Sequence, residues 1–263
     1  MIAQIPPADL PVPPPILVLA GGDRVRPVWR NELGGLTFEI TGSAGRRFAK
    51  WAPAGSGLDL APEVPRLRWA ATFSPVPRVL DAGADETGTW LLTAGLPGDS
   101  AVSPRWLAEP RAAATAIGRG LRALHERLPV EDCPFSWSVE RRVARVRAAG
   151  RHDPAQWHPD HGELSPGEAL ARLADPPPVD HLVVCHGDAC APNTLLYEDG
   201  SWSGHVDLGA LGVADRWADL AVATWSLGWN YGPGWQPVLL SAYGIEPDPR
   251  RTSYYRLLWD LSP

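Results

Sequence analysis

The chain has 263 residues, 44% of them apolar and 21% charged, which is typical of a globular protein with one large domain or two lobes. Its formal charge of −6 is unevenly placed, because residues 1–179 hold 20 acids and 20 bases whereas residues 180–263 hold 10 acids and 4 bases. A surface of that sign repels nucleic acid and attracts cations, so the charge disfavours nucleic-acid binding and favours a metal ion or a cationic substrate.

The cysteines and the apolar runs favour a location in the cytoplasm. Cys133, Cys185 and Cys190 form no Cys-x-x-Cys pair, which fits a reducing cytosol. A zinc site built from Cys185, His186 and Cys190 lacks a fourth ligand at a sensible spacing, so we disfavour it. The apolar run Ile16–Ala20 is too short to cross a membrane and has no basic cluster before it. We therefore expect a cytoplasmic protein without a membrane partner.

Strand patterns dominate the first 95 residues. The start, residues 1–30, is rich in proline and poor in periodicity, which predicts an extended arm leading into a first strand. The elements expected after it are strands over Thr37–Ile40, Arg47–Trp51, Val79–Ala82 and Trp90–Thr93, and one helix that begins near Pro62 and runs past Trp69.

Helical periodicity dominates the chain after a connector at residues 96–98. Apolar residues recur every three to four positions from Ala113 to Leu124, as on one face of a helix. The polar stretch 150–165 predicts a loop or insertion. The elements expected here are helices over Pro104–Arg127, Val139–Ala149, Pro166–Leu173, 216–229, 235–243 and 249–259, and short strands over His181–Cys185, Thr194–Tyr197 and Ser203–Asp207.

The strongest chemical signal is the run His186-Gly187-Asp188-Ala189-Cys190-Ala191-Pro192-Asn193, followed fourteen residues later by Asp207. Phosphoryl transfer from ATP requires a carboxylate near the attacking hydroxyl, hard oxygen ligands for Mg²⁺ and neutralisation of phosphate charge. Asp188 would orient and deprotonate the hydroxyl, and Asn193 and Asp207 would hold the metal. Each residue alone would more often be a turn or cap residue. Their order and spacing together favour the functional interpretation.

This pattern, His-Gly-Asp-x-x-x-x-Asn followed by Asp-x-Gly, resembles the signature of the aminoglycoside phosphotransferases. Asp132-Cys133-Pro134-Phe135 and Gly212-Val213-Ala214-Asp215-Arg216 also resemble the 3′-phosphotransferase branch of that family. The resemblance implies an α+β fold of the bilobal protein-kinase-like type. Residues 1–95 would form a small β-rich N-terminal lobe that binds nucleotide, and residues 96–263 a larger, mainly helical C-terminal lobe for catalysis and substrate binding.

The resemblance also places the nucleotide-binding parts of the family on this chain. Lys50 would contact the α- and β-phosphates, and Glu63 would pair with that lysine. The loop expected to cover the phosphates contains Gly34. Ala94 and Leu96 would offer backbone groups to adenine. Asp219 resembles the helix aspartate that braces the catalytic loop in this family.

The residues for the acceptor follow the family less closely. Asp160 and Asp260 are the carboxylates expected to bind substrate amines. Trp225 and Trp229 are aromatic candidates for a sugar ring or a cationic group. Ala210 stands where members that take the neomycin–kanamycin group commonly carry arginine, and the chain ends differently from those members.

The resemblance thus predicts an enzyme that uses ATP and Mg²⁺ to phosphorylate a hydroxyl of an aminoglycoside, with the 3′ type favoured, and that confers antibiotic resistance as a monomer or dimer. One alternative is a streptomycin-type 3″-phosphotransferase or a kinase of another small alcohol. An alternative of another class is a catalytically silent binding protein with a kinase fold, which the intact set Lys50, Asp188, Asn193 and Asp207 disfavours.

Overall fold

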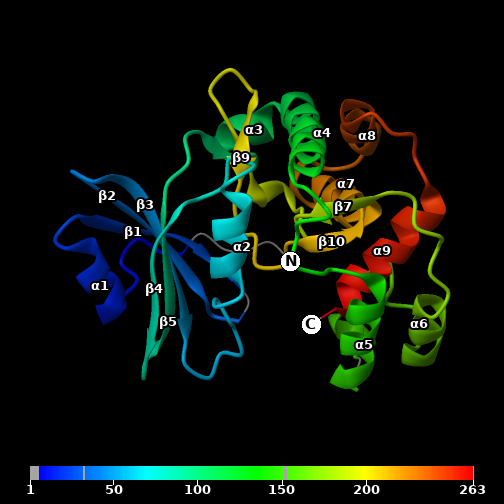
Figure 1. The fold of residues 1–263 in the computed structure, drawn as a ribbon, viewed down its shortest axis with the longest axis horizontal. Helices are drawn as coiled ribbons and strands as arrows, with labels where there is room; N and C mark the ends of the chain where they lie inside the picture. The colour runs from blue at the N-terminus through cyan, green and yellow to red at the C-terminus, as the bar shows by residue number, and fades with distance from the viewer. Residues whose placement is uncertain (1–5, 32, 151–152, 263) are drawn as a thin grey trace. The chain divides into compact units, whose positions relative to one another are not determined.

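The computed structural model describes residues 6–31, 33–150 and 153–262, which form two compact units (Figure 1). The first unit contains the described residues up to Pro97 together with Gly204–Gly209, and the rest of the described chain forms the second. The expected boundary after residue 95 lies two residues from this division, but the return of residues 204–209 to the first unit was not predicted. The roles expected for the two lobes stay predictions.

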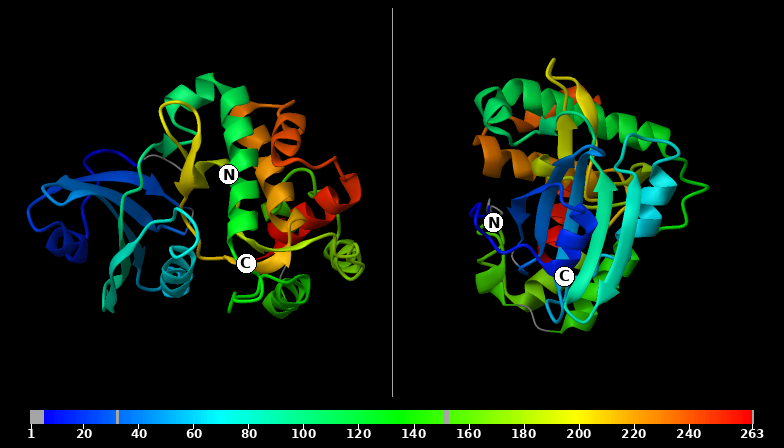
Figure 2. Two further views of the ribbon diagram at one scale, coloured as in Figure 1. Left: turned by 45° about the horizontal axis from the view of Figure 1, so that its top comes forward. Right: turned by 90° about the vertical axis from the view of Figure 1, so that its left-hand side faces the viewer.

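The first unit is built on a five-stranded antiparallel sheet with strand order β1-β2-β3-β5-β4. Figure 2 shows the sheet from two further directions. The predicted hairpin is present as β2 and β3, and the next two predicted strands pair as β4 and β5, each longer than predicted. The strands are β1 (Arg24–Arg30), β2 (Leu36–Gly42), β3 (Gly45–Pro53), β4 (Val79–Asp85) and β5 (Gly88–Ala94).

The proline-rich start is not the extended arm that the sequence predicts, because it contains the helix α1 (Pro14–Ala20) before β1. Proline suits the first turn of a helix, where its missing N–H would have no partner. Gly21 ends the helix with a left-handed φ of 60°. Ile16 and Ala20, one turn apart, are buried in a cluster with Phe38 of the sheet. A helix of seven residues owes its stability to such packing, which the local pattern does not reveal.

Alternation along β3 decides which way Lys50 points. Ala49 lies in the cluster under α1. Because successive side chains of a strand point to opposite faces, Lys50 projects from the other face of the sheet. On that side lies α2 (Glu63–Ala70), which begins one residue after Pro62 and buries Leu67.

Helices make up most of the second unit (Figures 1 and 2). The single helix predicted over residues 104–127 is two helices, because Pro110 has no N–H to continue the first one and Glu109 between them has a non-helical ψ of 56°. None of the described helices is both long and apolar enough to cross a lipid bilayer. The helices are α3 (Pro104–Ala108), α4 (Pro110–Arg127), α5 (Val139–Ala149), α6 (Pro166–Leu173), α7 (Trp217–Tyr231), α8 (Gln236–Tyr243) and α9 (Pro249–Leu261).

Short strands lie before and after the motif residues, all in the second unit except the last two residues of β9, which belong to the first. The pair β7–β10 is antiparallel and aligns Cys185, which directly precedes the motif, with Gly212. Strands β7, β8 and β9 were predicted to within two residues at each end, whereas β6 and β10 were too short to be recognised. The elements are β6 (Asp99–Ser100), β7 (Leu182–Cys185), β8 (Thr194–Leu196), β9 (Trp202–His205), β10 (Gly212–Asp215) and the 3₁₀ turns η1 (Pro154–Gln156) and η2 (Ala191–Asn193).

Helices α4 and α8 approach so closely at Gly118 that no side chain fits there. A Cβ on Gly118 would lie 2.4 Å from the carbonyl oxygen of Leu239 and 3.0 Å from the Cβ of Ala242. We expect Gly118→Ala to lower the free energy of unfolding by about 1–3 kcal/mol through overpacking. This loss should exceed the gain of up to about 1 kcal/mol that alanine brings to a helix interior. Urea denaturation followed by circular dichroism measures the difference.

Gly228 provides the matched control, because it lies in α7 and a Cβ there would meet nothing within 4 Å. Gly228→Ala should therefore stabilise the protein by up to about 1 kcal/mol. A stabilising effect of both substitutions would show that α4 and α8 are not in tight contact at Gly118.

Candidate active site

The loop after β7 is held by hydrogen bonds to a buried carboxylate of α7. The backbone N–H groups of His186 and Gly187 donate to Asp219 at 2.6 and 2.9 Å, and Asp219 is fully buried. Gly187 has a φ of 88°, and a Cβ there would lie 2.3 Å from the carbonyl oxygen of Ala210. The glycine of the motif is therefore required by backbone conformation and by close packing. Asp219 lies where the resemblance placed a brace of the catalytic loop.

Asp188 and Asn193 are brought together by the turn η2. The Asn193 side-chain Nδ2 donates to the Asp188 carbonyl oxygen at 2.9 Å and to its Oδ2 at 3.2 Å. Since the amide nitrogen faces Asp188, the amide oxygen Oδ1 of Asn193 points away, and it accepts no hydrogen bond from the described residues. The loop thus carries one carboxylate and one amide oxygen, the groups that the sequence predicts for a base and a metal ligand.

Asp219 also joins a buried network beneath this loop. His125 of α4 lies with Nε2 3.0 Å from Asp219 Oδ2 and with Nδ1 2.9 Å from the Tyr243 hydroxyl. Burial disfavours the charged form of Asp219, but the hydrogen bond with His125, the electrostatic interactions with His125 and His186 and the Gly187 N–H together lower its pKa. The site is thereby built to hold an ionised Asp219.

His125, Cys185 and Asp219 are the one group of potential metal ligands that meet among the described residues, with donor atoms within 4.8 Å of one another. Their bonding does not fit a metal site. The Asp219 oxygens already accept three hydrogen bonds, and the Cys185 thiol donates to the Asp215 carbonyl oxygen at 3.3 Å. Burial raises the pKa of Cys185 well above its usual value, which opposes the thiolate that zinc requires. We interpret the group as a buried hydrogen-bond network that stabilises the fold.

A second set of predicted residues meets in the first unit. Lys50 Nζ lies 2.9 and 2.7 Å from the two carboxylate oxygens of Glu63, and 2.8 Å from Asp207 Oδ1. Burial acts to lower the pKa of Lys50, but the charges of Asp207 and Glu63 outweigh it and raise that pKa above its ordinary value. Burial raises the pKa of the Glu63 carboxyl, and the Lys50 ammonium opposes this. The pairing of Lys50 with Glu63 matches the expectation, and Asp207 adds a second partner.

The backbone at Asp207 is strained. Among the described residues other than glycine, only Asp207 has a positive φ, which is 66°. That conformation costs about 1–2 kcal/mol for a residue with a side chain, and such strain is concentrated at functional sites. The side chain is 49% exposed although it pairs with Lys50.

The predicted adenine-binding residues differ in whether their backbone groups are available to a ligand. The N–H of Ala94 donates to the Arg78 carbonyl oxygen at 2.9 Å and is not available to a ligand. Leu96 has no hydrogen bond to the described residues, so its backbone N–H and carbonyl groups are available to a ligand. Gly34 lies in a tight turn before β2 with a φ of 84°, closed by a hydrogen bond from Asn31 N–H to the Gly35 carbonyl oxygen at 3.0 Å. Glu32 of that loop lies outside the described residues.

The acceptor residues expected from the sequence lie together, but with internal partners. The Trp225 indole N–H donates to Asp160 Oδ2 at 3.0 Å, and that of Trp229 lies 3.1 Å from His158 Nε2. Trp225 is only 4% exposed, so its ring belongs largely to the core. The Asp260 side chain is 9% exposed and accepts hydrogen bonds from the chain itself. The roles of Trp225, Trp229 and Asp260 in substrate binding stay predictions, and in this structure their polar groups have partners within the chain.

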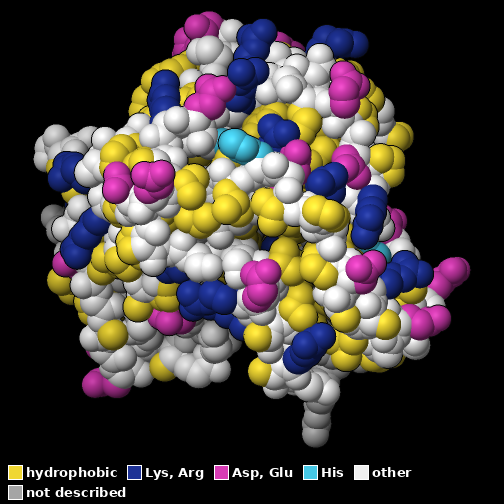
Figure 3. All heavy atoms as spheres, turned by 45° about the vertical axis from the view of Figure 1, so that its right-hand side comes forward, with side chains coloured by type: hydrophobic (Ala, Val, Ile, Leu, Met, Phe, Trp, Pro, Cys, Tyr) yellow, Lys and Arg dark blue, Asp and Glu magenta, His cyan; other side chains and the backbone are white. Residues whose placement is uncertain are grey.

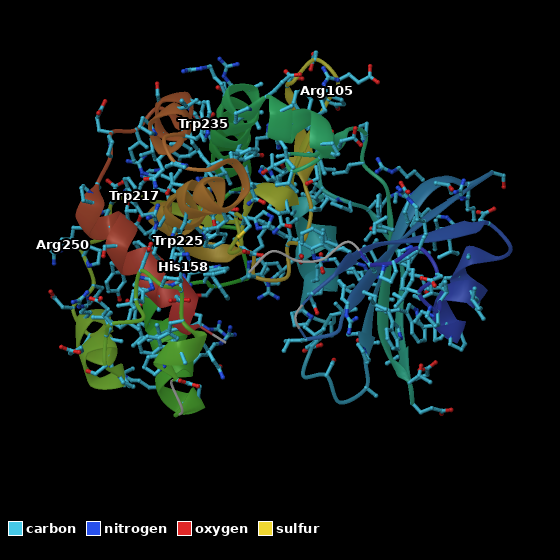
Figure 4. The ribbon with its side chains drawn as sticks, turned by 180° about the vertical axis from the view of Figure 1, so that it is seen from behind. Arg105, His158, Trp217, Trp225, Trp235 and Arg250 are labelled. Carbon is cyan, nitrogen blue, oxygen red and sulfur yellow. The ribbon has the colours of Figure 1, made fainter. Side chains whose placement is uncertain are left out.

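The sequence did not single out His158, which lies at the centre of this region. Figure 4 shows His158 beside Trp225. The ring centroids of His158 and Trp225 are 4.3 Å apart, those of Trp225 and Trp229 5.1 Å, and those of Trp229 and Trp259 5.8 Å. We call these four rings the His158 cluster. The spacing of Trp225 and Trp229, one helical turn apart, was the available signal, but nothing local connects it to position 158.

Acidic side chains do not form one patch on the face shown in Figure 3. There acidic and basic side chains alternate, with apolar side chains between them. Recognition of a cation on that face would therefore depend on individual carboxylates placed by their neighbours rather than on a broad negative field.

Comparison with known proteins agrees with this geometry. The model of the phosphotransferase enzyme family matches residues 30–255. The chain belongs to this family. It is 37% identical over 247 residues to an aminoglycoside 3′-phosphotransferase of Streptomyces fradiae, covering 87% of this chain and 91% of that protein. It is 36% identical over 263 residues to a streptomycin 3″-kinase of Streptomyces griseus, covering 92% and 93%.

A solved structure supports the same conclusion. The fold is similar to that of an aminoglycoside phosphotransferase from Streptomyces rimosus in complex with ADP and streptomycin, with a TM-score of 0.72 and 33% identity, covering 93% of this chain and 95% of that one. The predicted family and kinase-like fold class are confirmed. The chain is an enzyme of the kinase type, as predicted.

Proposed function

We propose that this enzyme transfers the γ-phosphoryl group of ATP to a hydroxyl of an aminoglycoside and so confers resistance to that antibiotic. The observation that carries the proposal is the loop 186–193, which is fixed by Asp219 and presents Asp188 beside Asn193. The acceptor oxygen forms a bond to the γ-phosphorus, the bond from that phosphorus to the bridging oxygen of ADP breaks, and Asp188 takes the hydroxyl proton. Asp188 acts here as the general base.

The remaining residues supply nucleotide binding. Lys50, held by Glu63, would neutralise the α- and β-phosphates of ATP. The oxygens of Asn193 and Asp207 are hard donors that fit Mg²⁺, and the charge of Asp207 suits a divalent cation. When bound, Mg²⁺ would neutralise charge that develops on the phosphates. The Leu96 backbone is the better of the two predicted contacts to adenine, because it has no hydrogen bond to the described residues.

Two observations favour an aminoglycoside as the acceptor. Relatives named as 3′-phosphotransferases and as a streptomycin 3″-kinase have nearly equal identity to this chain, 37% and 36%. The second unit also carries an exposed carboxylate, Asp160, beside the aromatic His158 cluster, and such an arrangement suits an amino sugar or a guanidinium group. We favour the 3′ type and keep the 3″ type as the alternative.

A coupled assay of ADP release tests the proposal. We expect turnover that depends on Mg²⁺ and on an added aminoglycoside, with neomycin and kanamycin representing 3′ acceptors and streptomycin the 3″ acceptor. Mass spectrometry should find one added phosphoryl group, and NMR of the product should identify its position. A non-aminoglycoside alcohol is the control. Turnover with that alcohol alone would refute the proposed acceptor class but not the phosphotransferase.

A further inference from the structure

Helix α7 holds the catalytic loop at two points. Near its first turn Asp219 accepts the N–H groups at the start of the loop, as described above. Two turns further along, the Ser226 hydroxyl accepts the backbone N–H of Ala191 at 2.9 Å. Asn230 in turn donates to the Ser226 carbonyl oxygen at 2.8 Å and lies 3.2 Å from its hydroxyl oxygen, which fixes that side chain. The position of the loop is thus set by the helix.

The same helix holds the loop 157–162 through two tryptophans. Trp225 directly precedes Ser226, and its indole N–H donates to the Asp160 carboxylate at 3.0 Å. Trp229, one turn later on the same side of the helix, points its indole N–H at His158 Nε2 at 3.1 Å. An indole N–H can only donate, so Nε2 accepts. Neighbouring residues of one rigid element therefore contact the catalytic loop and the carboxylate expected to face the acceptor.

Asp260 of α9 fixes the loop 157–162 from the other side. Its two carboxylate oxygens lie 3.1 and 3.0 Å from the backbone N–H of His158, and Oδ2 lies 2.7 Å from His161 Nδ1. With its side chain only 9% exposed, Asp260 has little surface left for a ligand. Its charge is used to order the loop.

Asp160 is the exposed carboxylate that remains on this loop beside the cluster. Its side chain is 54% exposed; Oδ2 accepts from Trp225 at 3.0 Å, and Oδ1 lies 3.5 Å from His158 Nδ1. The Trp225 ring is itself immobilised, because the Arg256 guanidinium lies 5.5 Å above it and donates to the Ala221 carbonyl oxygen and the Thr224 hydroxyl, each at 3.2 Å. A donor that is buried and fixed can orient an exposed partner at little entropic cost.

We propose that Trp225 is a positioning residue for acceptor recognition. Its indole N–H orients the Asp160 carboxylate toward a cationic group of the acceptor, and α7 sets the distance from that carboxylate to the catalytic loop. Asp260 is a buried brace of the loop 157–162 and not a contact to substrate. This inference rests on the proposed function and specifies how one cationic group of the aminoglycoside is bound.

Trp225→Phe tests the proposal, because it removes the indole N–H and keeps an aromatic ring. We expect the KM for the aminoglycoside to rise about tenfold, as the loss of one charge-assisted hydrogen bond predicts. The KM for ATP should stay unchanged, and kcat should fall less than threefold. A smaller rise in the aminoglycoside KM than in the ATP KM would overturn the proposal.

Trp217→Phe is the matched control. Trp217 lies on the same helix, is 2% exposed, and donates its indole N–H to a carboxylate, Asp180, at 3.2 Å. Figure 4 shows it apart from His158. Its replacement removes the same volume and the same kind of hydrogen bond, so both KM values should equal those of the wild type. An equal rise in aminoglycoside KM in this variant would assign the effect to the lost volume and overturn the proposal.

A double-mutant cycle separates positioning from direct contact. Asp160→Asn should raise the aminoglycoside KM, and adding Trp225→Phe should raise it no further, because Trp225 acts through that carboxylate. Additive effects would overturn the proposal. If Asp260 holds the loop 157–162 in place, Asp260→Asn should lower the melting temperature, whereas Asp160→Asn should not. An unchanged melting temperature with a raised KM in Asp260→Asn would make Asp260 a substrate contact instead.

The wild-type assay distinguishes a failure of the proposed function from a failure of the positioning role of Trp225. Turnover by the wild type with an unchanged KM in Trp225→Phe would overturn the positioning role alone. Absence of wild-type turnover with every aminoglycoside would overturn the proposed function, and the positioning role with it.

Discussion

Replacing Asp188 by asparagine should lower kcat by a factor of about 10²–10⁴, the usual contribution of a general base. Asparagine keeps the size of the side chain but cannot accept the hydroxyl proton. The contact from Asn193 to the Asp188 carbonyl oxygen is a backbone interaction and should survive the change. Binding of ATP, measured by calorimetry, and the melting temperature should therefore stay near the wild-type values. Stopped assays with a detection limit below one ten-thousandth of wild-type turnover are needed.

Asp199→Asn is the control for this prediction. Asp199 lies in the exposed turn between β8 and β9 in the same unit, and its partners are the N–H and hydroxyl of Ser201. Its replacement removes one negative charge without touching the loop 186–193, so kcat should not change. Full activity of Asp188→Asn would remove Asp188 from the role of base and leave only positioning and charge neutralisation as sources of catalysis.

Replacing Asp219 by asparagine should lower the free energy of unfolding at pH 7 by about 3–5 kcal/mol, the range found when one partner of a buried ionic contact is removed. The buried carboxylate accepts from His125 and from two backbone N–H groups. An asparagine NH₂ group would face one of these donors and leave it unsatisfied. Because the same bonds fix the catalytic loop, kcat should fall as well. Urea denaturation and the coupled assay measure the two effects.

The pH dependence of stability offers an independent test of the same network. The pKa of Asp219 is lowered in the folded protein, so its stabilising contribution is fully present above the unfolded value of about 3.9. It is lost as the pH falls through the lower folded pKa. The wild type should therefore lose stability below about pH 4 more steeply than Asp219→Asn does. Parallel slopes in urea denaturation between pH 2.5 and 7 would contradict the ionised, hydrogen-bonded state of Asp219.

The proximity of the predicted catalytic residues could be anticipated because the information for it is local. A run of eight residues carries Asp188 and Asn193, and the turn η2 within that run is sufficient to bring their side chains together. Lys50 was placed at the end of a strand by the resemblance. Since the structure buries Ala49, the two-residue alternation of a strand gives the next side chain the opposite direction.

The surroundings of the predicted acceptor residues could not be read from the sequence, because they come from distant segments. Asp260 was expected to face a substrate amine, yet His158 and His161, about a hundred positions away, take up its carboxylate. Trp225 was expected to offer an aromatic face, yet packing leaves it only 4% exposed, with its N–H bonded to Asp160. No property of these residues in isolation distinguishes a carboxylate that binds substrate from one that orders a loop.

The sequence by itself determined the family and the chemistry of phosphoryl transfer, and it predicted residues 186–193 as the catalytic loop, since order and spacing along a short segment define their local geometry. Only the tertiary structure decided which carboxylates are exposed, that residues 204–209 fold with the first unit so that Asp207 meets Lys50, and that α7 connects the catalytic loop with Asp160. The physical reason is that burial and hydrogen-bond partners are set by packing between segments far apart in the chain, whereas backbone turns and side-chain alternation are set by near neighbours.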